Sequence, residues 1–162
     1  TVRLRPLLDE IAGTVLPDGI AYRVVGHDAV VFADKAMLHE VFTNLFANAG
    51  QAVAEHGEVV VTLSSMGETL EALMSDNGSG IPPALLERVF EPFFTTRSGG
   101  TRLGLAIVRQ LVEMQGGQTD IMGSSPAGTT IRVRLPSARD VRGTDTRSAG
   151  ALAAPTRERE GR

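Results

Sequence analysis

Cysteine and tryptophan are absent from this chain of 162 residues, and aromatic residues make up only 4% of it. Without cysteine there is no disulfide framework, no thiolate nucleophile and no zinc–thiolate site. The three histidines, His27, His39 and His56, leave little material for a histidine-rich metal site. A net charge of −3 with so few aromatic rings argues against a nucleic-acid-binding surface. The chemistry must therefore come from carboxylates, amides, hydroxyls and backbone groups.

Long apolar runs are missing as well. No window approaches about 18 consecutive apolar residues, so no membrane span is expected in this chain. The first ten residues lack the apolar core of a secretory signal. The remaining balance, 42% hydrophobic and 22% charged residues, is typical of a soluble globular domain, which we expect to be cytosolic.

Charge and apolar content change near Pro136. Residues 1–136 carry 10 basic and 15 acidic residues, whereas residues 137–162 carry 6 arginines, 4 acidic residues and few large aliphatic side chains. The second segment cannot bury enough apolar surface to offset the entropy lost on ordering. The sequence therefore predicts one folded domain over residues 1–136 and a disordered tail over residues 137–162.

Helical and strand patterns both occur in the predicted domain. Apolar spacings of three and four predict helices from Pro6 to just before Pro17, from about Lys35 to His56 and from about Leu103 to Gln115. A shorter helix is expected near Pro83–Val89. Strands are predicted at residues 21–26, 30–33, 58–64, 69–74, 118–122 and 129–135, with His27-Asp28 as a turn between the first two. This mixture indicates a two-layer α/β sandwich in which three helices cover one sheet.

The predicted helix from Lys35 carries Asn44 and Asn48 one turn apart on one face. One interpretation is that nearby backbone groups satisfy both amides. The other is that an amide oxygen coordinates a hard cation such as Mg²⁺, which takes few protein ligands and fills the rest with phosphate and water.

The segment from Asp76 to Pro82 directly follows a predicted strand and contains Gly78 and Gly80. It can be interpreted simply as a glycine-rich turn. Alternatively, the Asp76 carboxylate accepts a hydrogen bond from an exocyclic amino group such as that of adenine. The two glycines would then let the backbone approach a flat base.

Two further segments follow. Three of the six phenylalanines lie within Phe90–Phe94, either as a local plug that anchors a long loop or as the hinge of a mobile lid. Residues 99–105 open a predicted helix, whose free N–H groups favour an anion, although they match neither a Walker loop nor the dinucleotide fingerprint. Together the four segments predict a site for an adenine nucleotide with Mg²⁺.

In this order the segments resemble the motifs of the catalytic, ATP-binding domain of bacterial sensor histidine kinases, in the GHKL superfamily. Residues 44–49 resemble the N box, 76–82 the G1 box, 90–96 the F box, 100–105 the G2 box and 128–131 the closing strand motif. The match covers about residues 4–136. The resemblance implies an α+β fold of the Bergerat type, with a mixed sheet of about five strands covered by three helices.

The resemblance also implies residue roles. Asp76 would bind the adenine amino group with help from Thr129 through water, and Gly78 and Gly80 would shape the base pocket. Asn48 would be the Mg²⁺ ligand and Asn44 would support the phosphates, which makes these two the predicted catalytic residues. The other predicted cofactor-binding positions are Ala52, Ile81, Thr95, Arg97, Gly100, Thr101, Arg102, Leu103, Gly104 and Leu105.

ATP-hydrolysing members of the superfamily carry Glu at the position of Asn44, and an amide cannot take a proton from water. We therefore expect the γ-phosphoryl group to pass to a histidine on a dimerisation domain that is absent from this chain. His39 is expected to be a surface or helix-packing residue rather than that acceptor. The expected partners are the dimerisation and phosphotransfer domain and a response regulator. The fragment is expected to be monomeric and the longer kinase homodimeric, in the cytoplasm or as the cytoplasmic part of a membrane-anchored sensor.

One position departs from the pattern, because the family usually has glycine where this chain has Arg102. Its bulk could enter the phosphate path, or its guanidinium could hold a phosphate. The first case would make the domain a nucleotide-binding pseudokinase, and Arg102→Gly would then tighten ATP binding. The same fold could also belong to a serine kinase of the anti-sigma type or to a GHKL ATPase. Acid lability of the phosphoamino acid separates a histidine kinase from a serine kinase.

Overall fold

The computed structural model describes residues 1–94 and 104–138, which form seven strands, three α-helices and one 3₁₀ turn. In chain order the elements are β1 (Val2–Arg3), α1 (Leu4–Val15), β2 (Ala21–Gly26), β3 (Val30–Val31), α2 (Lys35–Ala52), β4 (Glu58–Met66), β5 (Thr69–Asp76), the 3₁₀ turn η1 (Pro83–Leu85), α3 (Gly104–Met114), β6 (Gln118–Ser125) and β7 (Gly128–Pro136).

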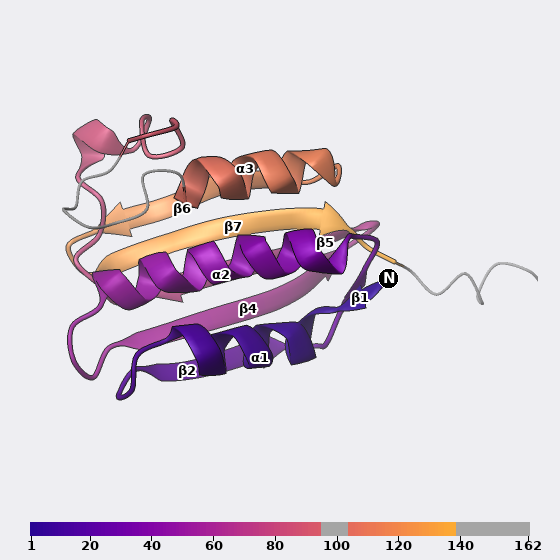
Figure 1. Cartoon of the computed structure of the whole chain (residues 1–162), viewed down its shortest axis with the longest axis horizontal. Helices are drawn as coiled ribbons and strands as arrows, with labels where there is room; N and C mark the ends of the chain where they lie inside the picture. Colours follow the sequence, from indigo (N-terminus) through magenta and orange to yellow (C-terminus); the bar gives the residue numbers. More distant parts are fainter. Residues whose placement is uncertain (95–103, 139–162) are drawn as a thin grey trace, which may run out of the picture.

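Five of the strands form a mixed sheet in the order β2-β4-β5-β7-β6. β2 pairs with β4 in parallel, and the other three pairs are antiparallel. α1, α2 and α3 cover one face of this sheet, with α2 packed between the other two (Figure 1). The predicted α+β sandwich, with a mixed five-stranded sheet beneath three helices, is confirmed.

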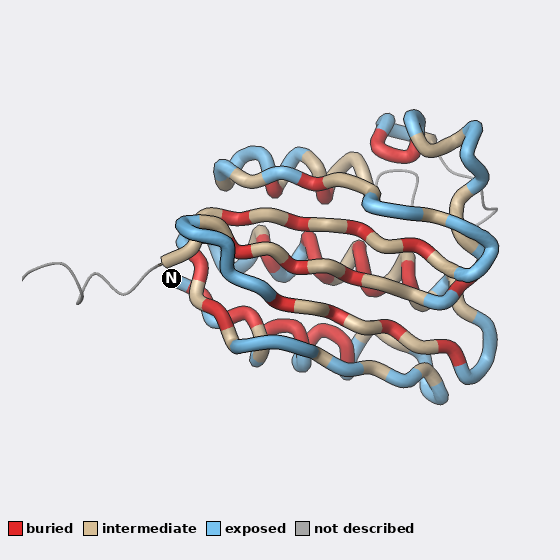
Figure 2. Tube along the Cα trace, turned by 180° about the vertical axis from the view of Figure 1, so that it is seen from behind, coloured by how far each residue is buried: buried red, intermediate tan, exposed pale blue. Residues whose placement is uncertain are grey.

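The core lies between the helices and the sheet. Alternate residues of each central strand point toward the helices, so that Val59, Val61 and Leu63 of β4 are buried while their neighbours are more exposed. Figure 2 shows the same alternation along β5 and β7. The helices contribute the largest buried side chains, including Leu8, Phe42 and Phe46. Period-two strands and period-3.6 helices therefore meet in one apolar layer.

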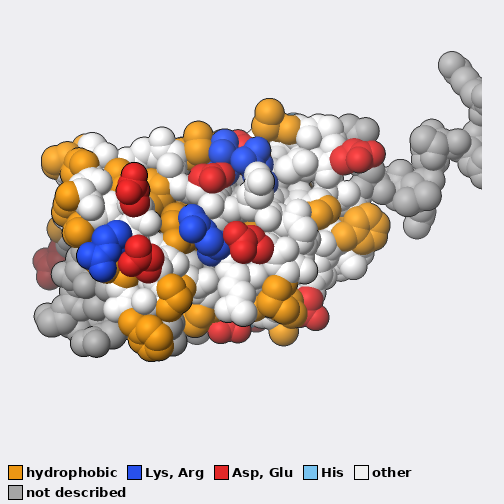
Figure 3. Space-filling model, turned by 90° about the horizontal axis from the view of Figure 1, so that it is seen from above, with side chains coloured by type: hydrophobic (Ala, Val, Ile, Leu, Met, Phe, Trp, Pro, Cys, Tyr) orange, Lys and Arg blue, Asp and Glu red, His pale blue; other side chains and the backbone are white. Residues whose placement is uncertain are grey.

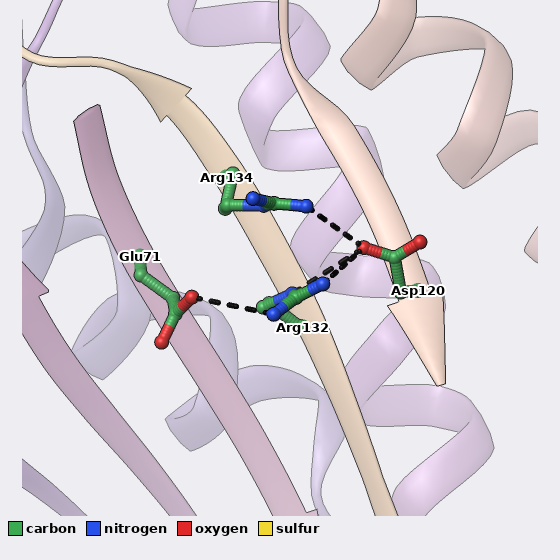
Figure 4. Close-up of polar contacts among 4 residues, drawn as sticks. All are labelled: Glu71, Asp120, Arg132 and Arg134. Atoms are coloured by element: carbon green, nitrogen blue, oxygen red, sulfur yellow. Dashed lines mark hydrogen bonds and ion pairs between the residues drawn. The ribbon is translucent and has the colours of Figure 1, made fainter. Parts of the chain in front are cut away.

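None of the described helices covers the opposite face of the sheet, which carries charged side chains (Figure 2). Arg132 on β7 pairs with Asp120 on β6 at 2.8 Å and with Glu71 on β5 at 3.8 Å, and Arg134 approaches Asp120 at 3.4 Å (Figure 4). On the side of the molecule seen over α3 and β6, acidic and basic side chains are intermixed with apolar ones (Figure 3).

The predicted turn at His27-Asp28 does not join a hairpin. β2 pairs with β4, whereas β3 pairs with β1 in a separate two-stranded sheet. The Asp28 carboxylate explains the change of direction, because it accepts hydrogen bonds from the Arg3 side chain and the Arg5 backbone N–H. These bonds fasten the segment after β2 to the start of α1.

Several boundaries differ from their predicted positions. α2 ends at Ala52 instead of His56, and His56 takes a left-handed backbone conformation with φ of 67°. The helix expected near Pro83–Val89 is only the 3₁₀ turn η1. β5 extends to Asp76, which brings that residue into the sheet itself.

Both ends of the described chain lie at the same end of the molecule (Figure 1). Beyond β7, the Ser137 N–H donates to the Glu68 carbonyl and the Ala138 N–H to the Val30 carbonyl. The rest of the predicted tail, residues 139–162, lies outside the described residues. Among the helices that the structure describes, none has the length and apolarity that a membrane crossing requires.

Candidate functional site

The candidate site lies at the end of the molecule opposite the chain ends. There β5 ends, β7 begins, α2 reaches its C-terminus and α3 starts (Figure 1). Asp76 and Thr129 are directly paired across β5 and β7. Thr129 is buried and Asp76 is half-buried. The sheet register therefore brings together the carboxylate and the hydroxyl that the sequence assigned to the same base.

The loop after β5 is fastened on two sides. The Asp76 Oδ1 atom accepts the Gly78 N–H at 2.9 Å, which forms an Asx turn and fixes the direction of the carboxylate. The Asn77 Oδ1 atom accepts the Glu58 N–H at 2.8 Å at the start of β4. The Ser79 N–H donates to the Ala52 carbonyl at 3.2 Å. Ala52, the last residue of α2, is thus in contact with the loop, and its role in cofactor binding stays a prediction.

Gly78 and Gly80 are required by contacts within the protein. A Cβ atom on Gly78 would lie 2.6 Å from the Ala52 carbonyl carbon, and one on Gly80 would overlap the Ser125 carbonyl. Gly80 also has φ of 74°, a conformation that side chains disfavour. The sequence assigned the glycines to close approach of a base. The structure adds a second reason, which is the close approach of two other backbone segments.

Ser124 is a site residue that the sequence analysis missed. Its Oγ accepts the Ile81 N–H at 2.6 Å and lies 3.1 Å from the Thr129 Oγ1 atom, so it joins two residues of the predicted pocket. A register shift between Ile121 and Gly123 places Ser124 opposite Thr129. A β-bulge of this kind re-aims the side chains that follow it. A serine near a strand end gives no signal for this in the sequence.

The two asparagines of α2 are both half-buried. Asn44 donates from Nδ2 to the Glu40 carbonyl of its own helix at 2.9 Å, so its amide oxygen is the atom left to act on a ligand. The Asn48 side chain makes no hydrogen bond to any described residue, and it lies one turn closer to Ala52 and the Asp76 loop. The backbone thus satisfies one donor of one amide, where the first interpretation had it satisfy both. The role of Asn48 as a cation ligand stays a prediction.

This donor set fits Mg²⁺ only in part. Among the described residues, no three His, Cys, Asp or Glu side chains gather into a possible metal site. A cation held near Asn48 would therefore take most of its oxygen ligands from phosphate and water, which is the usual arrangement for Mg²⁺ beside a nucleotide. One hard amide oxygen beside the start of α3, where the sequence predicts the phosphates, is compatible with that arrangement.

Of the residues predicted to line the phosphates, the structure describes only the last two along the chain. Gly104 and Leu105 are the first two residues of α3, where Gly104 is buried and Leu105 half-buried. α3 packs against α2, so these residues lie at the same end of the molecule as Asn48 (Figure 1). The remaining predicted positions, Thr95, Arg97, Gly100, Thr101, Arg102 and Leu103, lie outside the described residues.

The phenylalanine segment is divided between core and surface. Phe90 is buried, as the plug interpretation requires, and the Arg109 guanidinium of α3 lies 3.9 Å from its ring centroid. Phe93 is 71% exposed and takes a left-handed conformation with φ of 64°. The hinge interpretation involves the residues after Phe94 and stays a prediction.

Comparison with known proteins assigns this geometry to a family. The family model described as "Histidine kinase-, DNA gyrase B-, and HSP90-like ATPase" matches residues 33–139. The sensor histidine kinase ZraS of Escherichia coli strain K12 is 37% identical over 119 residues, which cover 72% of this chain and 26% of that protein. The chain thus spans about a quarter of the length of this curated relative.

Solved structures agree with that assignment. The mycobacterial sensor histidine kinase MprB matches with a TM-score of 0.77 and 30% identity, covering 84% of this chain and 97% of that one. Full-length ShkA in complex with AMPPNP matches with a TM-score of 0.74 and 29% identity, covering 86% of this chain and 31% of that one. These relatives give no support to a pseudokinase function.

Proposed function

Because this chain belongs to the family of histidine kinase-, DNA gyrase B- and HSP90-like ATPases, we propose that it holds ATP with Mg²⁺ and presents the γ-phosphoryl group to a histidine. The histidine would belong to a dimerisation domain outside this chain. The chain itself is an ATP-binding catalytic domain of the histidine kinase type. The observation that carries the proposal is the Asp76–Thr129 pair beside a loop fastened to α2.

The adenine end follows from the direction of the Asp76 carboxylate. An ionised carboxylate accepts hydrogen bonds and cannot donate them, so it favours an exocyclic amino group and repels a carbonyl at the same place. The Asx turn to Gly78 orients it, and the Ser124–Thr129 contact supports the neighbouring hydroxyl. We assign Ala52, Gly78, Gly80 and Ile81 to the walls of this base pocket.

The phosphate end is assigned to α2 and α3. The Asn48 amide oxygen would hold Mg²⁺, and the Asn44 amide oxygen would support the phosphates. Gly104 and Leu105 would offer backbone N–H groups at the start of α3, where the helix dipole favours an anion. When bound, Mg²⁺ would neutralise charge on the phosphate oxygens. We assign the predicted positions from Thr95 to Leu103 to the same end from the sequence alone.

Transfer to a histidine is favoured over hydrolysis. Hydrolysing members of the superfamily need a carboxylate to take a proton from water, and this chain has the amide of Asn44 at that position. The chain would therefore not activate water. A neutral imidazole is a nucleophile at pH 7 and needs no such base. His39 is exposed on α2 itself, a surface residue as predicted, and is not assigned the acceptor role.

Partners and location follow from the family proposal. The dimerisation and phosphotransfer domain of the same kinase would supply the acceptor histidine, and a cognate response regulator would receive the phosphoryl group. We propose that the isolated chain is monomeric and that the longer kinase is a homodimer. Its place would be the cytoplasm, either free or as the cytoplasmic part of a membrane-anchored sensor.

Calorimetric titration of ATP, with and without Mg²⁺, tests the adenine pocket. The whole chain should bind ATP saturably, and Asp76→Asn should weaken binding at least about tenfold, because an amide that donates toward the base replaces an acceptor. Asp120→Asn is the matched control, since it alters a carboxylate on the far face of the sheet and should bind ATP normally. Equal affinities of the parent chain and Asp76→Asn would refute the pocket.

Phosphotransfer needs a second experiment. The chain is mixed with its separately produced dimerisation domain and labelled ATP. A label that acid removes and alkali preserves would identify phosphohistidine and support the proposal. An acid-stable label would identify a serine kinase instead, and ATP binding without any label on the domain would contradict transfer.

A further inference from the structure

Residues 83–94, here called the connecting segment, are attached to the rest of the domain in an unusual way. Their backbone hydrogen bonds are all local steps of three residues, such as Arg88 N–H to the Leu85 carbonyl and Phe94 N–H to the Glu91 carbonyl. Within the part of the chain that the structure describes, no backbone bond joins this segment to a helix or strand. Among the described residues, the attachment of the segment to the helices and strands is therefore made by side chains.

Phe90 provides the main side-chain attachment. It is 9% exposed, and its neighbour Val89 is 8% exposed, whereas most of the segment is on the surface. The Arg109 guanidinium lies 3.9 Å from the Phe90 ring centroid, which is a close cation–π contact. Arg109 belongs to the second turn of α3, so this contact bridges the segment and the helix.

The other cation–π pair cannot serve this purpose. Arg88 lies 4.6 Å from the Phe94 ring centroid and pairs with Glu91 at 3.3 Å, but all three residues belong to the connecting segment. These contacts stiffen the segment without attaching it to the domain. Arg109 is thus the one charged residue, among those described, that bridges to an aromatic ring of the segment.

We propose that Arg109 is a positioning residue for nucleotide binding, acting through Phe90 to hold the connecting segment against α3. The proposal rests on the proposed function. The segment follows Ile81 of the base pocket, and α3 begins at Gly104 on the phosphate side, so the contact ties together two parts of one site.

Local stability explains why binding would depend on this contact. A segment with few buried contacts and only local hydrogen bonds opens at low free-energy cost. If ATP binds only the attached form, the apparent dissociation constant rises as the attached fraction falls. A partly desolvated cation–π contact is strong enough to change that fraction several-fold.

The test compares Arg109→Met, Arg109→Lys and Phe90→Leu in the whole chain. Arg109→Met keeps the aliphatic length and removes the charge, and it should weaken ATP binding about three- to tenfold. Arg109→Lys restores a cation and should recover most of the affinity. Arg23→Met is the matched control, because Arg23 is exposed on β2 and, among the described residues, forms an ion pair only with Glu58.

Hydrogen exchange measures the attachment without nucleotide. Residues 83–94 should exchange faster in Arg109→Met and Phe90→Leu, while the free energy of global unfolding stays close to the parent value. The double variant that combines Arg109→Met and Phe90→Leu should bind ATP no more weakly than the weaker-binding single variant. Each substitution removes the same contact, so their effects should not add.

The outcomes separate this inference from the proposed function. If the parent chain fails to bind ATP, the proposed function fails, whereas faster exchange in Arg109→Met would still show the attachment. Unchanged exchange and unchanged ATP affinity in Arg109→Met would overturn the inference while leaving the function standing. Failure of Arg109→Lys to recover affinity, or additive losses in the double variant, would also overturn it.

Discussion

Asn44 and Asn48 lie one turn apart on α2, yet their surroundings differ. The Asn44 side chain donates to the carbonyl of Glu40, whereas the Asn48 side chain has no hydrogen bond to a described residue. Asn48 is therefore the amide with more donor and acceptor capacity for a ligand. This difference within one helix face is consistent with the two separate roles that we propose, phosphate support for Asn44 and metal binding for Asn48.

Asn48→Ala should weaken ATP binding about tenfold in Mg²⁺ and much less in a chelator, because only the metal contact is removed. Gln51→Ala is the control, since Gln51 is exposed on the same helix. Calorimetry under both conditions checks the prediction. An equal loss with and without Mg²⁺ would assign Asn48 to the nucleotide instead of the metal.

Tyr22 is a second residue whose surroundings predict a measurable property. Burial, followed by the nearby Asp9 carboxylate that accepts its hydroxyl, raises the pKa of Tyr22 well above the usual 10.0. The folded state thus prefers the neutral phenol. Its contribution to stability is complete below pH 10 and is lost as the pH rises further.

Tyrosinate absorbance can follow this residue alone, because Tyr22 is the only tyrosine and tryptophan is absent. The folded chain should resist ionisation at pH values where the urea-unfolded chain already ionises. Tyr22→Phe keeps the edge-to-face contact with Phe46 and supplies the baseline. Identical titrations of folded and unfolded chain would contradict the predicted shift.

Helix α2 depends on an N-terminal cap, Asp34, that also bonds to the residue following α3. The Asp34 carboxylate accepts the Met37 N–H at 2.9 Å, and the Asp34 N–H donates to the Gln115 side chain at 3.0 Å. Asp34→Ala should lower the free energy of unfolding by about 1 kcal/mol, measured by urea denaturation. Asp34→Ser should recover most of the loss, since serine also caps. An unchanged midpoint in Asp34→Ala would show that the cap contributes nothing.

Most elements could be predicted from the sequence because their apolar periodicity reports the burial that forms them. α1, α2, β4, β5 and β7 follow this rule, and each is buried on one face. The pairing of β3 could not be predicted, because it depends on Asp28 meeting Arg3 and Arg5 from another part of the chain. A strand of only two residues, such as β3, is too short to have an apolar periodicity from which its partner could be inferred.

The candidate site also contains residues that could be expected from the sequence and residues that could not. That Asp76 and Thr129 lie together could be expected from motifs with a fixed order along the chain, and the pairing of β5 with β7 brings them together; their roles in binding stay predictions. Ser124 could not be expected there, since its role arises from a bulge in β6 that only the folded sheet reveals. The contacts that require Gly78 and Gly80 are likewise long-range, to α2 and β6. Local chemistry could be inferred from the residues, whereas contacts between distant segments could not.

At the scale of the whole molecule, the domain has two functionally different ends. The candidate site lies at one end, and Thr1 and Ala138 lie at the other, where β3 bonds both β1 and the segment after β7 (Figure 1). Segments joined to the chain there would leave the nucleotide end open. The candidate site is built from the ends of β5, β6 and β7 together with α2 and α3, whereas the sheet face away from the helices carries paired charges.

The charged face of the sheet makes the free energy of unfolding depend on pH in the acidic range. Hydrogen bonding from Arg132, with the positive charges of Arg132 and Arg134, holds the pKa of Asp120 below its usual 3.8 (Figure 4). A lowered pKa means that the carboxylate stabilises the folded state above pH 3.8 and loses this effect as the pH falls through its folded pKa. Because Asp120 is 44% exposed, solvent screening keeps the contribution below about 1 kcal/mol.

Asp120→Asn should therefore be slightly less stable than the parent chain at pH 7, and the difference should shrink as the pH is lowered below 3.8. Urea denaturation of both chains across that range measures it. Raised salt should reduce the difference at pH 7 as well, since the ion pairs are partly exposed. A difference that stayed constant with pH would mean that Asp120 acts through its shape and hydrogen bonds, and that its charge contributes nothing to the sheet.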